Sequence, residues 1–334
     1  MVSAVIFVAT SCVSPLTGFA FWETNLAYEG ESIYNYLQVK NLSDRTILST
    51  NVLFGVQSVT MKDKGLTGMY YDTALAAPAL ADNANSALIL GMGTGTYARQ
   101  LKQYYPKMNI TGVEIDQKIT DLAGEYFDEP ADIPVTTYDG RAWLAASHDK
   151  YDVIMVDAYQ DITIPFQMSS TEFFTMVREH LNPGGVMVVN MNMISDGQGS
   201  INEALSDTIA SVFGNGNTLT ADVPNTTNRE LFAKKPGSGS EENSMQQASK
   251  ALNLRETTYE RTGSEDLEWY MEEVASRFRK VNEPDSASTI LTDDKAPVEV
   301  LGMHAIDQII ADEAGPYRQI LKDEGLGGLL RAVQ

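Results

Sequence analysis

Cysteine, histidine and basic residues are all scarce in this chain of 334 residues. Its single cysteine, Cys12, excludes an internal disulfide framework and any metal site built from several cysteines. The three histidines, His148, His180 and His304, are scattered without the close spacing of a zinc site or any sign of a histidine-based triad. The sequence therefore predicts no metal site.

Basic residues number 24 against 45 acidic ones, which gives a formal net charge of −21. A nucleic-acid-binding surface needs a basic stripe, so we expect no nucleic-acid partner. An acidic cleft would concentrate a cationic small molecule, although a well-solvated surface explains the same composition. With 43% hydrophobic and 21% charged residues, the chain is of the globular class.

Residues 1–22 contain no charged side chain, yet several serines, threonines and a proline interrupt their apolar character. A bilayer-spanning helix needs about 20 apolar residues, and a secretory signal begins with basic residues that this segment lacks. We interpret the segment as membrane-proximal, either a weak anchor or the remnant of a larger membrane portion. A packing arm is the alternative.

Two folded units are expected after this segment. Residues 23–80 hold short β-prone runs between turn residues, which predicts a small antiparallel sheet followed by a helix at 70–80. In residues 81–334 strands and helices alternate, which predicts a Rossmann-like doubly wound α/β sheet with a helical C-terminal extension. The expected strands are 87–90, 110–114, 135–137, 153–156 and 186–190, the expected helices are 97–105, 117–127, 141–147 and 171–181, and a late hairpin is expected within 214–235.

The most informative stretch is Leu88-Ile-Leu-Gly-Met-Gly-Thr-Gly-Thr96, in which an apolar run leads into a turn with three alternating glycines. Such a turn is typical of the start of a Rossmann-type nucleotide site, because glycine lets the backbone approach a ligand closely. Close packing of the strand against the next helix is the structural alternative. The candidate binding residues of the turn are Gly91, Gly93, Thr94 and Gly95.

Acidic residues stand at the ends of the next three expected strands. Glu114 comes about 20 residues after the first glycine, where a carboxylate can bind the two hydroxyls of a ribose. Asp139-Gly140 follows the third strand and Asp157 follows the fourth. Ligands of a doubly wound sheet lie outside the carboxyl ends of its strands, so we expect these acids to share one rim. A turn role for Asp139 and a helix cap at Asp157 are the structural alternatives.

The rim suggests which ligand the glycine turn binds. The G-x-G-x-G spacing differs from the dinucleotide pattern G-x-G-x-x-G, and the additional acids would repel a diphosphate. A ligand with a ribose, an adenine and a positive charge suits the rim better. S-adenosylmethionine and its decarboxylated form have all three features, and we expect one of them as the cosubstrate.

Residues 34 to about 190 resemble the spermidine synthase (polyamine aminopropyltransferase) family. The matching pieces are Tyr34-Asn35, Gly55-Val-Gln57-Ser58, Tyr70-Tyr-Asp72, Gly91-Met-Gly-Thr-Gly95, Val113-Glu-Ile-Asp116, Asp139-Gly140, Asp157-Ala-Tyr and Pro183-Gly-Gly185. The stretch Thr292-Asp-Asp-Lys-Ala-Pro297 resembles the spermidine synthase-like branch, which is often fused to a membrane transporter-type region. The resemblance implies aminopropyl transfer from decarboxylated S-adenosylmethionine to a small amine, with release of methylthioadenosine. It also implies a homodimer. We expect the protein in the cytoplasm, with the apolar residues 1–22 as a point of membrane association.

The same resemblance implies roles by position. Gln57 would contact the nucleoside and Glu114 the ribose, while Asp139, with Gly140, would hold the adenine amino group. Asp157 would be the carboxylate beside the reacting amine, with Tyr70 next to it. The positions implied for the amine substrate are Tyr71, Asp72, Gln160 and Asp161.

Several positions depart from the family pattern. Thr94 stands where the family keeps an aspartate that binds the aminopropyl amine, and Tyr71-Asp72 replace a histidine and a glutamate. Gln160 replaces a second aspartate, with Asp161 one residue displaced, and the later Tyr-Pro stretch reads Pro224-Asn-Thr-Thr-Asn228. The nucleoside half of the pocket is therefore kept and the amine half is altered. Methyl transfer, a methylthioadenosine-releasing lyase and a non-catalytic nucleoside-binding domain stay open as alternatives.

Overall fold

The computed structural model describes residues 23–51, 56–63, 65–158, 164–191, 197, 199–224, 226, 228–237, 251–286, 288–304 and 322. Residues 1–22, for which the sequence suggests a membrane-proximal role, lie outside this part of the chain. Among the described residues, no helix has both the length and the apolar character needed to cross a membrane.

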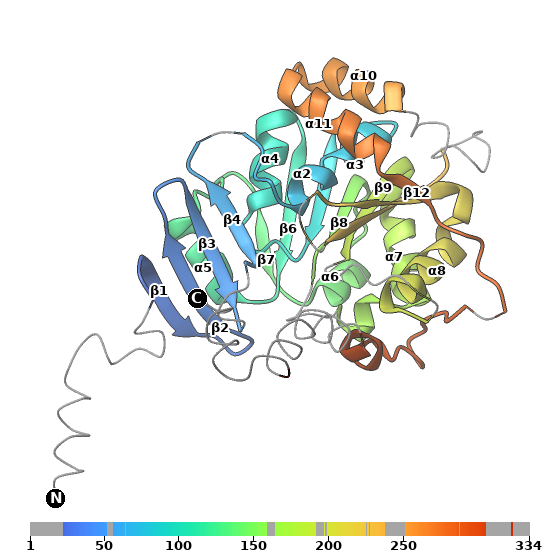
Figure 1. Ribbon diagram of the computed structural model, residues 1–334, viewed down its shortest axis with the longest axis horizontal. Helices are drawn as coiled ribbons and strands as arrows, with labels where there is room; N and C mark the ends of the chain where they lie inside the picture. The colour runs from blue at the N-terminus through green and yellow to red at the C-terminus, as the bar shows by residue number, and fades with distance from the viewer. Residues whose placement is uncertain are drawn as a thin grey trace, which may run out of the picture.

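The chain begins with a small antiparallel sheet, as the turn-separated β-prone runs predict. Its strands follow one another in chain order, and each pairs with the next. They are β1 (Leu26–Glu31), β2 (Tyr36–Asn41), β3 (Arg45–Thr50) and β4 (Ser58–Met61). In Figure 1 this sheet lies at one side of the large sheet.

A mixed eight-stranded sheet forms the centre of the molecule, in the order β12-β10-β11-β9-β8-β5-β6-β7. The strands β7, β6, β5, β8 and β9 are parallel, and β11, β10 and β12 are joined antiparallel at the other end. Their bounds are β5 Ser86–Leu90, β6 Asn109–Glu114, β7 Val135–Thr137, β8 Tyr151–Val156, β9 Leu181–Met191, β10 Thr218–Asp222, β11 Arg229–Lys234 and β12 Phe278–Lys280. The Rossmann-like prediction is confirmed.

Helices cover both faces of the large sheet (Figure 1). Alternate strand residues bury in two cores: Ile89 and Val188 face α2, α3, α4, α10 and α11, whereas Leu90 and Val189 face α6, α7 and α8. The helices are α2 Tyr70–Ala74, α3 Ala76–Leu80, α4 Thr96–Tyr104, α5 Gln117–Tyr126, α6 Gly140–Ala146, α7 Thr171–His180, α8 Ile201–Phe213, α10 Ala251–Thr262 and α11 Glu265–Ser276, with short 3-10 turns at Phe166–Met168 and Asn215–Asn217.

The helix expected at 70–80 is two short helices, α2 and α3. Pro78 has no N–H to donate to the carbonyl of Ala74, and the hydroxyl of Tyr97 donates to that carbonyl instead, at 3.1 Å. Both helices bury residues in the core of the large sheet, among them Ala74 and Leu80. We therefore propose a boundary of the N-terminal unit near residue 69 rather than at 80.

Helix α5 joins the two sheets. Its Ile119 and Leu122 pack against Leu37 and Leu48 of the small sheet in a third apolar cluster. Asp116 caps the start of α5 and also accepts hydrogen bonds from two residues of the β1–β2 turn, Ser32 and Asn35. The small sheet is therefore fixed over the edge of the large one.

Two expectations for the second half of the chain need correction. The hairpin expected within 214–235 exists as β10 and β11, but the glycines of 214–217 precede β10 and do not join the two strands. The charged segment after α11 is not wholly helical, because Phe278–Lys280 adds β12 to the edge of the large sheet.

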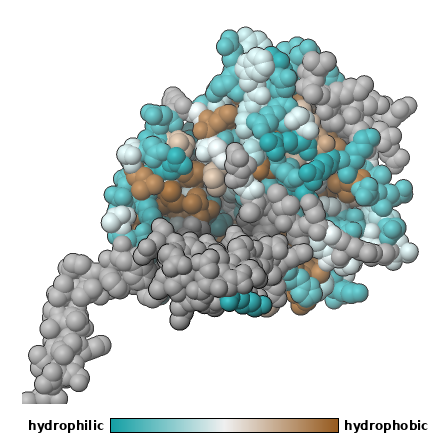
Figure 2. All heavy atoms as spheres, in the orientation of Figure 1, coloured by the Kyte–Doolittle hydropathy of each residue, from teal (hydrophilic) through white to brown (hydrophobic). Residues whose placement is uncertain are grey.

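Hydrophilic residues gather over α10 and α11, whereas apolar residues gather on the side of the small sheet (Figure 2).

Candidate active site

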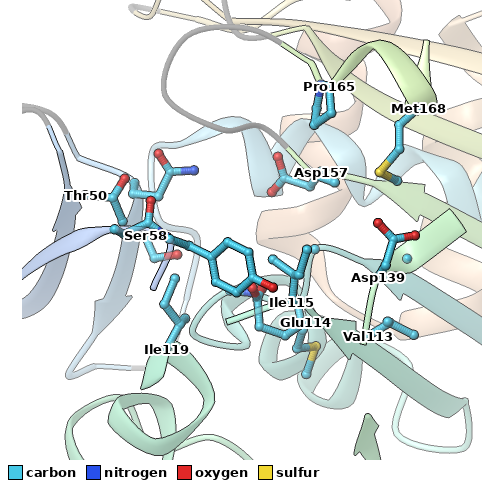
Figure 3. Close-up of a pocket in the computed structure, with 18 of the residues that line it drawn as sticks. Thr50, Ser58, Val113, Glu114, Ile115, Ile119, Asp139, Asp157, Pro165 and Met168 are labelled. Atoms are coloured by element: carbon cyan, nitrogen blue, oxygen red, sulfur yellow. The ribbon is translucent and has the colours of Figure 1, made fainter. Parts of the chain in front are cut away.

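A cavity opens between the small sheet and the carboxyl ends of β5, β6 and β8. The sheet order reverses between β5 and β8, and the crevice at such a point is where doubly wound sheets bind ligands. Thr50 and Ser58 lie on the small-sheet side of the cavity, and Pro165 and Met168 lie on the far side (Figure 3). The sequence-predicted residues that line it are Gln57, Tyr70, Tyr71, Gly91, Gly93, Glu114, Asp139, Gly140 and Asp157.

The glycine turn forms one wall of the cavity. Gly91, Gly93 and Gly95 have φ angles of 87°, 56° and 78°, which L-amino acids other than glycine rarely adopt. A Cβ atom at Gly91 would lie only 2.3 Å from the carbonyl oxygen of Asp157. The turn therefore packs directly against the backbone of Asp157, and this close packing requires glycine at Gly91. Gly91 also lines the cavity.

Thr94 and Gly95, which were predicted to bind the cosubstrate, do not line the cavity. The side chain of Thr94 is buried, and its hydroxyl lies 3.4 Å from the hydroxyl of Thr96. Gly95 is the N-cap of α4 and faces the side chain of Glu129. The direct contact predicted for these two residues is therefore not supported by their placement.

Glu114 ends β6 beside the glycine turn and is almost fully buried. Its two carboxylate oxygens accept backbone hydrogen bonds from Gly93 at 2.8 Å and from Asp116 at 3.0 Å. Burial raises the pKa of Glu114, and these backbone bonds partly offset that rise. Each oxygen of a carboxylate has a second acceptor position, so the pair can still receive two ribose hydroxyls.

Asp139 lies both at the start of α6 and in the wall of the cavity. Its carboxylate caps α6 by accepting a hydrogen bond from the backbone N–H of Ala142 at 2.7 Å. The same residue and Gly140 line the cavity. Figure 3 shows Asp139, Glu114 and Asp157 around the same space, so three strand ends do deliver a carboxylate to one rim.

Asp157 follows β8 and is held from two sides. The hydroxyl of Tyr70 donates to Oδ2 at 2.6 Å, and the amide of Asn190 on β9 donates to Oδ1 at 2.9 Å. Burial raises the pKa of Asp157 to about 7, with the charge of Glu114 adding to the rise and the two hydrogen bonds opposing it. An aspartate in this state can exchange a proton at neutral pH.

The two residues after Tyr70 have different placements. Tyr71 lines the cavity; its ring centroid lies 4.0 Å from that of Tyr70, and its hydroxyl donates to the carbonyl of Gln57 at 3.1 Å. Asp72 does not line the cavity, so its placement does not support the role predicted for it at the substrate. Successive helical residues turn by about 100°, which carries Asp72 to the opposite side of α2 from Tyr70.

Asp72 instead fixes the loop before α2. Its carboxylate is fully buried and accepts hydrogen bonds from the backbone of Thr67 and Gly68, the hydroxyl of Thr67 and the side-chain amide of Gln100. Gln160 and Asp161, the other residues predicted at the amine substrate, lie outside the described residues.

Sequence reasoning missed several residues around the rim. Asn190 reads as the polar end of an apolar strand, but its amide orients Asp157 and accepts a hydrogen bond from Asn228 at 2.9 Å. Arg141 on α6 donates to the carbonyl of Gln167 in the cavity wall and pairs with Asp293. Asp293 belongs to the stretch Thr292–Pro297, for which the sequence analysis gives a family resemblance but no role at the site.

No group of three or more metal-ligating side chains occurs within the described ranges.

Comparison with known proteins identifies the family. The Spermine/spermidine synthase domain matches residues 69–235, which span α2 to the end of β11. A probable polyamine aminopropyl transferase of Bifidobacterium longum is 99% identical over all 334 residues, which cover 75% of that protein. The chain belongs to the spermine/spermidine synthase family. The family match includes Tyr70, the glycine turn, Asp139 and Asp157.

Solved structures of the family share the fold. A probable spermidine synthase of Corynebacterium glutamicum aligns with a TM-score of 0.55 at 21% identity, covering 80% of this chain and 99% of that one. A spermidine synthase solved with the transition state analogue AdoDATO aligns with a TM-score of 0.56 at 18% identity, covering 78% and 85%. Both alignments show that this chain shares its overall fold with those two structures.

Proposed function

We propose that this protein is an aminopropyltransferase that moves the aminopropyl group of decarboxylated S-adenosylmethionine to a small amine. The observation that carries the proposal is the hydrogen bond from Tyr70 to Asp157 at the cavity, directly above the glycine turn. Family membership supports the same reaction, because the relative at 99% identity bears the name of a probable polyamine aminopropyl transferase.

In the proposed reaction, the nitrogen of a neutral amine attacks the carbon next to the positively charged sulfur. The C–N bond forms as the C–S bond breaks, and the electron pair of the broken bond neutralises the sulfonium. Methylthioadenosine leaves, and the alkylated nitrogen keeps the positive charge as an ammonium ion. The one proton released overall is the proton that the acceptor loses before it attacks. Much of the rate comes from holding the nitrogen, carbon and sulfur in line.

Asp157 meets the two needs of the acceptor. A free alkylamine has a pKa of about 10 by analogy with lysine, so it arrives mostly as an ammonium ion. The carboxylate of Asp157 attracts that ion, and its pKa of about 7 lets it receive the proton directly or through water. Tyr70 and Asn190 keep the carboxylate in one orientation while this happens.

Glu114 and Asp139 suit the nucleoside half of the donor. Glu114 is pinned by Gly93 and Asp116 in a position to receive the ribose hydroxyls, and Asp139 lies across the cavity where the adenine amino group would donate. A rim with the carboxylates of Glu114, Asp139 and Asp157 repels a further negative charge. It therefore favours the decarboxylated donor over intact S-adenosylmethionine, whose carboxylate would face these acids.

The test is to incubate the protein with each sulfonium and a panel of amines and to follow all products by mass spectrometry. We expect methylthioadenosine and an amine heavier by one aminopropyl group in equal amounts, with the decarboxylated donor only. A homocysteine-nucleoside product, or methylthioadenosine formed without consumption of an amine, would overturn the proposal. A homodimer and contact of residues 1–22 with a membrane stay predictions for solution measurements on the full chain.

A further inference from the structure

Asp116 is a buried carboxylate beside the cavity to which the proposed reaction gives no role. It comes two residues after Glu114, the last residue of β6, and only 2% of its surface is exposed. Asp116 itself does not line the cavity. Its hydrogen bonds nevertheless connect the two walls between which the cavity opens.

The backbone of Asp116 fixes the carboxylate that suits the ribose. Its N–H donates to Oε1 of Glu114 at 3.0 Å, while Oε2 of Glu114 accepts from the N–H of Gly93 at 2.8 Å. Oδ1 of Asp116 caps α5 by accepting from the N–H of Lys118 at 3.0 Å. The position of Glu114 therefore depends on the position of Asp116.

The second carboxylate oxygen of Asp116 reaches the small sheet. Oδ2 accepts from the hydroxyl of Ser32 at 2.5 Å and from the amide of Asn35 at 3.0 Å. Both residues lie in the turn between β1 and β2. The hydroxyl of Ser32 also accepts the backbone N–H groups of Tyr34 and Asn35, at 3.1 and 2.9 Å, so it shapes the turn that it fastens to Asp116.

This turn carries part of the cavity wall. Tyr34 and Asn35 both line the cavity. The side-chain amide of Asn35 is used at both ends, because its nitrogen donates to Asp116 and its oxygen accepts from the amide of Asn51 at 2.9 Å. A continuous chain of hydrogen bonds therefore runs from the rim of the large sheet to the wall on the small-sheet side.

We propose that Asp116 is a positioning residue for the nucleoside, which holds the ribose carboxylate Glu114 and the turn of Ser32 and Asn35 at one fixed separation. The inference rests on the proposed function. A nucleoside between the two walls contacts both of them at once only at the right separation. A link that already exists in the free protein removes the cost of ordering the turn when the nucleoside binds. Asp116 therefore raises the affinity for a ligand that it does not touch.

The variant Asp116→Asn separates this role from the capping of α5. Asparagine is as good an N-cap as aspartate, because its amide oxygen can still accept from the N–H of Lys118. Its NH₂ group only donates, so it cannot accept from Ser32 or Asn35. The substitution therefore keeps the cap and breaks the link to the small sheet.

The experiment titrates the full chain with methylthioadenosine in a calorimeter. This ligand is uncharged, so a change in attraction for the sulfonium does not enter. We expect its dissociation constant to rise about ten- to a hundredfold in Asp116→Asn, as for the loss of hydrogen bonds to a charged group. The donor KM should rise by a similar factor, with kcat within about twofold of the wild type. Asp121→Asn removes the same charge from an exposed residue of α5 and should leave the dissociation constant unchanged.

Ser32 provides an independent set of variants. Ser32→Ala removes the hydroxyl and should weaken methylthioadenosine binding about tenfold, whereas Ser32→Thr keeps a hydroxyl and should restore it. Because both substitutions break one link, the double variant of Ser32→Ala and Asp116→Asn should bind about as weakly as Asp116→Asn alone. Should Asp116→Asn fail to fold, Ser32→Ala and Ser32→Thr carry the same test.

Three results would overturn the inference: an unchanged dissociation constant in Asp116→Asn, an equal loss in Asp121→Asn, or losses that add in the double variant. A fall in kcat at constant donor KM would also overturn it, because a residue that only positions the nucleoside leaves the reacting groups in place. The titrations require no turnover. Absence of transfer with any donor, with these binding differences intact, would therefore count against the proposed reaction alone.

Discussion

The hydroxyl of Tyr70 lies 2.6 Å from Oδ2 of Asp157, although 87 residues separate them in the chain. Tyr70 stands at the start of α2, and Asp157 follows β8 at the point where the sheet order reverses. This contact joins the layer above the sheet to the carboxylate at its rim. Each of the two side chains is held in position by a residue from a distant segment of the chain.

Replacing Tyr70 by phenylalanine should lower turnover by about ten- to a hundredfold, because Asp157 loses a hydrogen bond that orients it. The same bond lowers the pKa of Asp157, so its loss should move the pH at which activity is half-maximal upward. Steady-state rates across pH measure both effects. Tyr104→Phe is the matched control, since Tyr104 also bonds an aspartate, Asp266, but lies away from the cavity. An equal effect of the two variants would contradict the role of Tyr70.

The pH dependence of the wild type should show the raised pKa of Asp157 directly. Ionised Asp157 is the active form, so kcat/KM should fall as the pH drops below about 7, whereas an ordinary aspartate would stay ionised to much lower pH. Protonation of the acceptor adds a second dependence near its own pKa. Repeating the profile with an amine of different pKa separates them: the limb near pH 7 should stay in place. A limb that moves with the amine would count against Asp157.

Gly91→Ala should destabilise the protein by at least about 2 kcal/mol and reduce activity, because the new methyl group would collide with the Asp157 carbonyl at a positive φ angle. Gly124→Ala is the control. Gly124 lies on the exposed side of α5 with open space around it, so alanine there should leave stability unchanged or raise it by up to about 1 kcal/mol. Thermal and denaturant unfolding measure the difference, and similar behaviour of the two variants would contradict the packing described for the turn.

The pair of Arg141 and Asp293 should act on donor binding rather than on chemistry. Asp293→Asn frees Arg141, whose other contact is the carbonyl of Gln167 in the cavity wall. The pair is partly exposed and contributes about 1 kcal/mol or less, so we expect the donor KM to rise by no more than about tenfold with kcat unchanged. A fall in kcat at constant KM would show that the pair acts on the reacting groups instead.

The sequence was sufficient for the parts of the fold that depend on local pattern. The apolar runs of 87–90 and 153–156 and the glycine turn between strand and helix predicted β5, β8 and the rim, because a parallel sheet brings its strand ends together. The carboxylates Glu114, Asp139 and Asp157 were found by this reasoning, and all three line the cavity.

Other features depend on contacts between distant segments. The family resemblance implies a substrate role for Asp72 because Tyr70-Tyr-Asp72 matches a family motif, but the phase of the short helix α2 turns Asp72 away from the cavity. Phe278–Lys280 reads as a charged helical segment until β10 supplies an edge to pair with. Glu230 is a charged residue next to Arg229, which suggests exposure to solvent. It is buried because β11 lies between β9 and β10. For Phe278–Lys280 and Glu230, the contact that determines the placement comes from a segment remote in the chain.

The most direct test of the account is the Asp157→Asn variant, measured for both turnover and nucleoside binding. The amide keeps the size of the side chain but can neither attract an ammonium ion nor accept its proton, so we predict a loss of transfer of about a hundredfold or more. The dissociation constant of methylthioadenosine should stay within a fewfold of the wild type, because Glu114 and Asp139 are untouched. Transfer that survives the substitution, or nucleoside binding lost in parallel with it, would contradict the central role of Asp157.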